Sequence, residues 1–155
     1  MSRVQLALRV PDLPAPIASR STLFCAERAE LRDGYADFAI ADPPLELVLV
    51  QGAPDEDTRI DHLGVEVDTG EAVRTATTRL AGQGLATDVE NDTACCHALQ
   101  DKAWIHGPGR QPWEVNVVKA DADSMTEQKG STRCADPAVT GAGPAAPVEA
   151  GGRCP

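Results

Sequence analysis

The chain opens with a regular alternation of apolar and polar residues. Its apolar members are Val4, Leu6, Leu8 and Val10. Because successive side chains of a strand point to opposite faces, this alternation predicts a strand over residues 3–10, with Gln5 on the face opposite the apolar row. A similar alternation returns at residues 60–67, where His62 takes the place that Gln5 has in the first strand.

The pattern after each of these strands predicts the same succession of elements. In the first half we expect a helix over about 14–25 and strands over 35–41 and 45–51. In the second half we expect a helix capped by Asp68 or Thr69 that ends near 83, and strands over 86–92, 97–105 and 113–119. The order strand, helix, strands therefore occurs twice.

The two halves also match residue by residue, which indicates an internal duplication. Sliding one half onto the other places Gln5 on His62 and, after a gap for the longer second half, Glu46 on Glu114. The expected fold is therefore α+β, with two βαβββ modules that form a curved mixed sheet around a shared metal cleft.

Composition divides the chain into a domain and a tail. The modules cover about 2–52 and 60–120, so we expect one domain over residues 1–123. Residues 124–155 are rich in Gly, Ala and Pro and lack periodicity, which is typical of a disordered tail.

Charge narrows the classes of partner. The 155 residues include 24 acidic and 14 Lys or Arg side chains, so the formal net charge is −10. This charge disfavours nucleic acid and anionic membrane surfaces. A strand begins almost at once, in place of a signal peptide or a membrane span, so we expect a cytoplasmic protein, either a monomer or a homodimer.

The duplicated strands offer candidate metal ligands. Gln5 and Glu114 each stand between two apolar neighbours, and His62 precedes Leu63 in an alternating strand, so we expect all three on the face opposite the apolar rows. An imidazole nitrogen, a carboxylate and an amide carbonyl suit a divalent first-row metal, and three ligands leave positions open for substrate or oxygen. Glu46 is a fourth candidate from the repeat.

The chain has five cysteines, and their pattern favours thiols over a disulfide framework. Cys95 and Cys96 are adjacent, and an odd total suits a reducing compartment. We interpret Cys25 as a small apolar residue near a helix end, and Cys134 and Cys154 as incidental residues of the tail.

Several motifs resemble the vicinal oxygen chelate superfamily of glyoxalases and extradiol dioxygenases. They are Val-Gln-Leu around Gln5, Asp-His-Leu-Gly-Val-Glu-Val around His62, and Gln-Pro-Trp-Glu-Val around Glu114. Within that superfamily, Glu90-Asn-Asp-Thr-Ala-Cys-Cys-His-Ala-Leu-Gln-Asp-Lys102 is similar to the signature of the organoarsenical C–As lyase and cadmium-induced protein family, which also shares the opening Val-Gln-Leu-Ala-Leu-Arg-Val.

The resemblance implies a non-haem iron(II) enzyme that uses dioxygen to cleave the carbon–arsenic bond of trivalent methyl or aromatic arsenicals and releases arsenite. Gln5, His62 and Glu114 would hold the iron, for which Ni, Co or Mn can substitute in a purified sample. Cys95 and Cys96 match the thiols that hold the arsenic. Chelation by both thiols would require an irregular, mobile segment over 94–97, because neighbouring side chains of a regular strand point apart.

Some positions depart from the family pattern. His97 and Asn116 stand where aromatic residues are common, so we expect a more polar pocket that His97 lines, with a role of His97 as an additional metal ligand as the alternative. We interpret Glu46 as a residue of the pocket wall. Two other functions stay open: a non-enzymatic scavenger of cadmium or arsenite, and a glyoxalase-like isomerase or thiol transferase that would use Glu46 as a fourth ligand.

Overall fold

The computed structural model describes residues 2–95, 97–107, 109 and 111–122. The first half contains β1 (Arg3–Val10), α1 (Pro14–Phe24), β2 (Glu30–Arg32), β3 (Tyr35–Ile40) and β4 (Leu45–Gln51). The second half contains β5 (Arg59–Glu66), α2 (Gly70–Gly82), β6 (Ala86–Cys95), β7 (Ala98–His106) and β8 (Trp113–Asp121). Both halves therefore have the predicted βαβββ order.

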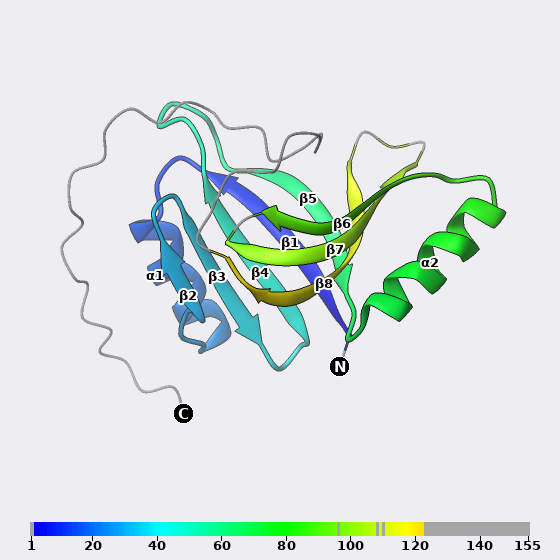
Figure 1. Ribbon diagram of the computed structural model, residues 1–155. Coiled ribbons are helices and arrows are strands. Elements are labelled where there is room, and N and C mark those ends of the chain that lie inside the picture. Colours follow the sequence, from blue (N-terminus) through cyan, green and yellow to red (C-terminus); the bar gives the residue numbers. More distant parts are fainter. Residues whose placement is uncertain (1, 96, 108, 110, 123–155) are drawn as a thin grey trace.

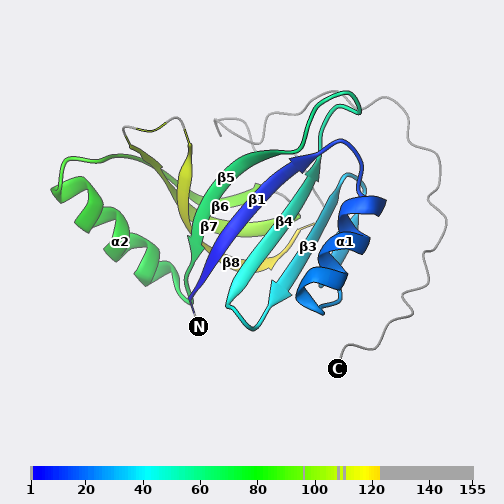
Figure 2. The ribbon, with the colours of Figure 1, turned by 180° about the vertical axis from the view of Figure 1, so that it is seen from behind.

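The strands form one curled, mixed sheet in the order β2-β3-β4-β1-β5-β8-β7-β6. The first strand of each module pairs in parallel with the last strand of the same module, and β1 and β5 join the modules by antiparallel pairing. Figure 1 shows how the sheet curls, and Figure 2 shows β1 and β5 in the middle with a helix to either side. The predicted fold is confirmed, and equivalent strands of the two modules meet at its centre.

Each helix covers the outer face of its own half. In the first half, Leu13 and Ile17 pack with Phe38, Leu47 and Leu49. In the second half, Val73 of α2 packs with Ala103 and Val117. Burying these apolar side chains outside the curl leaves the inner face for polar groups.

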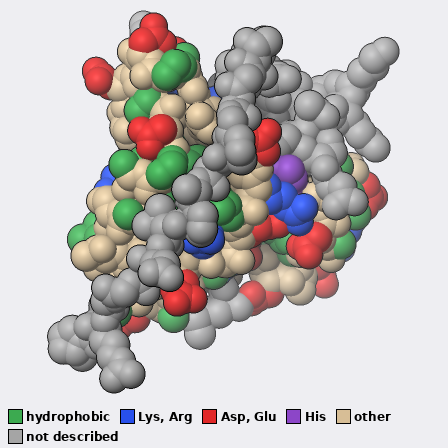
Figure 3. All heavy atoms as spheres, turned by 90° about the vertical axis from the view of Figure 1, so that its left-hand side faces the viewer, with side chains coloured by type: hydrophobic (Ala, Val, Ile, Leu, Met, Phe, Trp, Pro, Cys, Tyr) green, Lys and Arg blue, Asp and Glu red, His purple; other side chains and the backbone are tan. Residues whose placement is uncertain are grey.

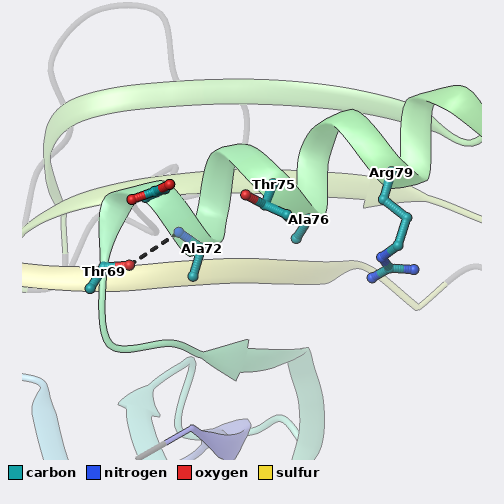
Figure 4. A pocket seen from close by; sticks show the side chains of 6 residues that line it. Thr69, Ala72, Thr75, Ala76 and Arg79 are labelled. Carbon is teal, nitrogen blue, oxygen red and sulfur yellow. Dashed lines mark hydrogen bonds between the residues drawn. The ribbon is translucent and has the colours of Figure 1, made fainter.

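Helix α2 begins as the sequence predicts. The Thr69 side chain accepts a hydrogen bond from the Ala72 amide at 3.1 Å, and Figure 4 shows this cap beside a shallow hollow along the helix. The hollow lies on the outside of the helix, whereas the predicted ligands lie on strands of the sheet. Within the described residues, no helix is both long and apolar enough to cross a membrane.

Two strand predictions need correction. The three-residue strand β2 was not predicted, because a short edge strand carries too few residues to show alternation. Strand β6 extends to Cys95, so the irregularity expected over 94–97 is wrong for Ala94 and Cys95. The register shift lies earlier, between Glu90 and Thr93, and His97 adopts a left-handed backbone with φ of 64° in the turn before β7.

Candidate metal centre

Gln5 and Glu114 lie on either side of Gly64 in three neighbouring strands. Gly64 of β5 pairs with Gln5 of β1 on one side and with Glu114 of β8 on the other. Residues paired in this way point to the same face of a sheet. The Gln5 and Glu114 side chains are 8% and 3% exposed, so both donor groups are held inside the curl.

Gly64 makes the space for these two donors. A Cβ at residue 64 would lie 2.6 Å from Gln5 Oε1 and 3.0 Å from Glu114 Cγ. Both distances are shorter than van der Waals contact, so any side chain at this position would displace the amide oxygen. Gly64 therefore leaves a cradle between the amide and the carboxylate.

His62 precedes Gly64 by two residues and shares its face. Its Nε2 lies 3.6 Å from Glu114 Oε1, and its ring packs edge-on against Trp104 with the centroids 5.4 Å apart. Strands β1, β5 and β8 thus bring Gln5, His62 and Glu114 together, as the duplicated pattern predicts. Both halves contribute to this site.

A β-bulge turns Asp61 onto His62. Ala7 pairs with His62, but Leu8 pairs with Ile60, so Asp61 is an extra residue in β5. Its Oδ2 accepts a hydrogen bond from His62 Nδ1 at 2.9 Å, while Arg9 donates to its Oδ1 at 2.9 Å. The Nδ1 proton is held by Asp61, so Nε2 is the ring nitrogen that faces Glu114.

These contacts set the protonation of the imidazole. Burial disfavours the charged ring, but the interactions of His62 with Asp61 and Glu114 outweigh it and raise the pKa of His62 to about 9. Burial also opposes ionisation of Asp61, yet hydrogen bonds from His62 and Arg9 lower the pKa of Asp61 to about 2. Without a metal ion, His62 is therefore a cation between two carboxylates.

Asn116 connects the two oxygen donors. Its Nδ2 donates to Gln5 Oε1 at 3.3 Å and to Glu114 Oε1 at 3.1 Å, and its side chain is buried. This amide fixes both acceptors with their oxygens directed toward one point. Buried polar side chains therefore gather at this position.

The donor chemistry fits a divalent first-row metal. One imidazole nitrogen, one carboxylate and one amide oxygen converge beside the cradle at Gly64, and each is fixed by a partner. Among the described residues, no three His, Cys, Asp or Glu side chains gather into a metal-binding group, so a metal site at this point would have to include the amide of Gln5.

The inner face beyond Gln5 becomes apolar. Ala7 follows Gln5 by two residues and packs with Tyr35, Val48 and Val50. The Tyr35 ring contacts the His97 ring with the centroids 5.5 Å apart, so the turn between β6 and β7 reaches across to the first half. His97 is buried there.

The structure describes two of the five cysteines, Cys25 and Cys95. Cys95 ends β6 and is buried, close in the chain to the His97 contact. Cys25 and Cys95 each take part in a disulfide bond, whereas the sequence suggested free thiols. The interpretation of Cys25 as only a small apolar residue at a helix end is therefore wrong. Cys96, Cys134 and Cys154 lie outside the described residues, as does the predicted tail.

Comparison with known proteins identifies the family. Residues 3–115 match the Glyoxalase/Bleomycin resistance protein/Dioxygenase superfamily. The chain belongs to this superfamily. It is 59% identical to the trivalent organoarsenical cleaving enzyme of Thermomonospora curvata, over 86% of this chain and 89% of that protein.

One further relative supports the family, and one solved structure shares the fold. Cadmium-induced protein CadI of Mycobacterium tuberculosis is 52% identical, over 81% of this chain and 82% of that protein. The Mn(II)-bound glyoxalase of Novosphingobium aromaticivorans superposes with a TM-score of 0.56 at 19% identity, over 80% of this chain and 42% of that chain. Within the superfamily, the chain therefore belongs to the family of organoarsenical cleaving enzymes and CadI proteins, as its motifs suggested.

Sequence reasoning missed three residues of this superfamily site. Asp61 was missed because regular alternation would place its side chain on the face opposite His62, and only the bulge reverses that. Gly64 did carry a signal, since a lone glycine within a strand often marks a close approach. Arg3 was also missed. On the face shown in Figure 3, basic and acidic side chains gather beside a histidine.

Proposed function

We propose that this protein uses an iron(II) ion and dioxygen to cleave the carbon–arsenic bond of trivalent organoarsenicals and releases arsenite. The 59% identity to an organoarsenical cleaving enzyme supports the reaction class. The observation that carries the proposal is the convergence of Gln5, His62 and Glu114 around Gly64. An open nitrogen and oxygen donor set of this kind suits a metal that reacts with dioxygen.

Gln5, His62 and Glu114 would hold the iron, and Co, Ni or Mn would be able to replace it. Iron(II), when bound, supplies the redox chemistry that reduces dioxygen. Asp61 keeps the proton on His62 Nδ1, so Nε2 is the ring nitrogen that would bind the metal. Asn116 holds the oxygens of Gln5 and Glu114 in place. The residues of the chain thus orient the donor atoms before the ion arrives.

Cys95 and Cys96 would capture the arsenical, because trivalent arsenic is soft and favours thiolate sulfur. The ring contact between Tyr35 and His97 brings the turn that follows Cys95 to the inner face of the first half. The apolar wall formed by Ala7, Tyr35, Val48 and Val50 would then surround the organic group and exclude water. Capture requires both cysteines to be reduced.

The direct test is an assay with reduced protein, iron(II), methylarsenite and air. We expect release of arsenite together with uptake of dioxygen, and neither without oxygen. Cys95→Ser and Cys96→Ala should abolish release while leaving the affinity for the metal within about threefold, since thiolates are not ligands in the proposed site. Aromatic arsenicals in the same assay would define the substrate range.

The alternatives predict different results from this assay. A thiol scavenger would bind the arsenical tightly without consuming oxygen. A glyoxalase-like enzyme would not need Cys95 or Cys96. If reduced wild-type protein loaded with iron releases no arsenite from any of these arsenicals, the proposed reaction is wrong.

Metal affinity should rise with pH, because the ion must displace a proton from His62. The pKa of His62 is raised to about 9, so the ring is protonated at pH 7 in the metal-free protein. Each pH unit between about 7 and 9 should lower the dissociation constant for Co(II) about tenfold, and the dependence should level off above that range. Calorimetry in two buffers of different ionisation enthalpy should detect about one proton released at pH 7.5. An affinity that does not change over this range would contradict a role of His62 as ligand.

A further inference from the structure

Glu46 occupies the place in the first half that Glu114 has in the second. It pairs with Gln5 across the parallel strands β1 and β4, so both side chains point to the inner face. The residue is 7% exposed. A buried carboxylate beside Gln5 is therefore a fourth oxygen donor within the same curl.

Arg3 holds this carboxylate from the side. The Arg3 guanidinium lies two residues before Gln5 on the same face, and its Nη2 is 2.7 Å from Glu46 Oε2. The same guanidinium donates from Nε and Nη2 to the two oxygens of Glu66, at 3.0 and 3.1 Å. Because two carboxylates hold the planar guanidinium, its position is fixed rather than free to follow Glu46.

Glu66 holds the Arg3 guanidinium from the neighbouring strand β5. Glu66 pairs with Arg3 across β1 and β5, and Asn116 pairs with Glu66 across β8. Arg3, Glu66 and Asn116 thus form a second row of paired residues, two positions along the strands from the row of Glu46, Gln5, Gly64 and Glu114. Arg3 reaches from this second row to Glu46, which lies beside Gln5 in the first row.

We infer that Arg3 is a positioning residue that holds Glu46 out of the metal site and so limits the site to three protein ligands. This inference rests on the proposed function. A fourth protein ligand would take a position that dioxygen or substrate needs, whereas a carboxylate paired with a guanidinium is a poor competitor for it. Arg3 thereby separates a site open to oxygen from the four-ligand arrangement that the internal repeat would otherwise produce.

The surroundings of Glu46 act in the same direction. Burial is the main cause that raises the pKa of Glu46 to about 8, opposed by the charge of Arg3 and assisted by the neighbouring charges of Asp37 and Glu66. The carboxyl also shares a hydrogen bond with Asp37 of β3. Glu46 is therefore engaged by Asp37 of β3 and by Arg3 of β1.

The test uses Co(II), whose visible absorption weakens as its coordination number rises, in four full-length proteins. They are the wild type, Arg3→Met, Glu46→Gln and the double variant. In Arg3→Met, Glu46 should join the site, so the dissociation constant for Co(II) should fall about tenfold and the absorption should weaken. The double variant should return both quantities to the wild-type values, and Glu46→Gln alone should change neither.

Two controls separate ligation from simpler effects. Arg3→Lys keeps the charge but loses the fork that engages two carboxylates, so it should fold and show a smaller change in the same direction. Arg59→Met removes an exposed guanidinium paired with Glu56 and should leave the Co(II) spectrum unchanged. In the iron form, Arg3→Met should lose arsenite release, and the double variant should regain it.

Each outcome decides one of the two proposals. Unchanged affinity and spectrum in both Arg3 variants would overturn the role of Arg3 while leaving the metal site intact. Tightening that persists in the double variant would also overturn it, because the gain would then be a general effect of charge. A wild-type protein that binds no Co(II) would instead overturn the proposed metal site, and the inference with it.

Discussion

Replacing Glu114 with glutamine is expected to weaken Co(II) binding by more than about 100-fold, which exceeds what a supporting residue near a metal contributes. The change removes the buried charge of the carboxylate and keeps its size. One carboxylate oxygen, Oε1, faces both His62 Nε2 at 3.6 Å and the Asn116 amide at 3.1 Å, and an uncharged amide oxygen in its place is a weaker ligand. Equilibrium titration of the metal-free protein with Co(II) measures the effect.

The matched control is Glu46→Gln, at the equivalent position of the other half. Arg3 engages Glu46, which is not a proposed ligand, so replacing its carboxylate with an amide of the same size removes no donor from the metal site. We therefore expect metal affinity within about threefold of the wild type, as for a residue that is not a ligand. Equal losses in the two variants would mean that both carboxylates bind the ion.

Glu46 and Glu114 show which features of the site the sequence predicts and which it does not. The repeat alone places Gln5, Glu46, His62 and Glu114 in equivalent positions, and the structure brings all four to one face. What distinguishes Glu46 is its partner Arg3, which stands 43 positions away in the chain and reaches it through the parallel pairing of β1 and β4. Alternation predicts which face a side chain occupies, but it does not predict which charged neighbour will engage it.

The fold was more predictable than the site because it depends on periodicity over many residues. Strands β1, β5 and β8 and the cap of α2 follow from alternation and from Thr69. The bulge at Asp61 and the register shift before Thr93 each depend on one extra residue in a strand, which a periodic pattern does not locate. Both irregularities lie beside residues proposed to carry function, as is common for β-bulges.

The same reasoning explains the error at the cysteines. The pattern predicted that the chain becomes irregular at Ala94 so that two adjacent thiols can act together. The structure instead turns β6 at Asp92, which has a φ of 52°, and then continues as a strand to Cys95. Asp92 is held there by Asp101, whose Oδ1 accepts from its amide at 2.9 Å. This contact lies between strands and could not be read from the local sequence.

Gly64→Ala is expected to weaken Co(II) binding by about 10- to 100-fold while the protein still folds. The new Cβ would lie 2.6 Å from Gln5 Oε1, so the amide oxygen must leave the cradle. That oxygen is the far end of a flexible side chain and can move, but the Glu114 backbone oxygen at 3.2 Å can move less, so we also expect a loss of about 1–3 kcal/mol in the free energy of unfolding.

Gly82→Ala provides the control, because a Cβ at this last residue of α2 would meet no atom within 4 Å. Both variants add one methyl group to a glycine, so a difference between them reports the surroundings alone. Metal titration together with thermal unfolding separates the two effects, since displacement of Gln5 changes affinity in protein that is still folded. If Gly64→Ala binds Co(II) as tightly as Gly82→Ala, the amide of Gln5 is not a ligand, and His62 and Glu114 would have to hold the ion with a different third group.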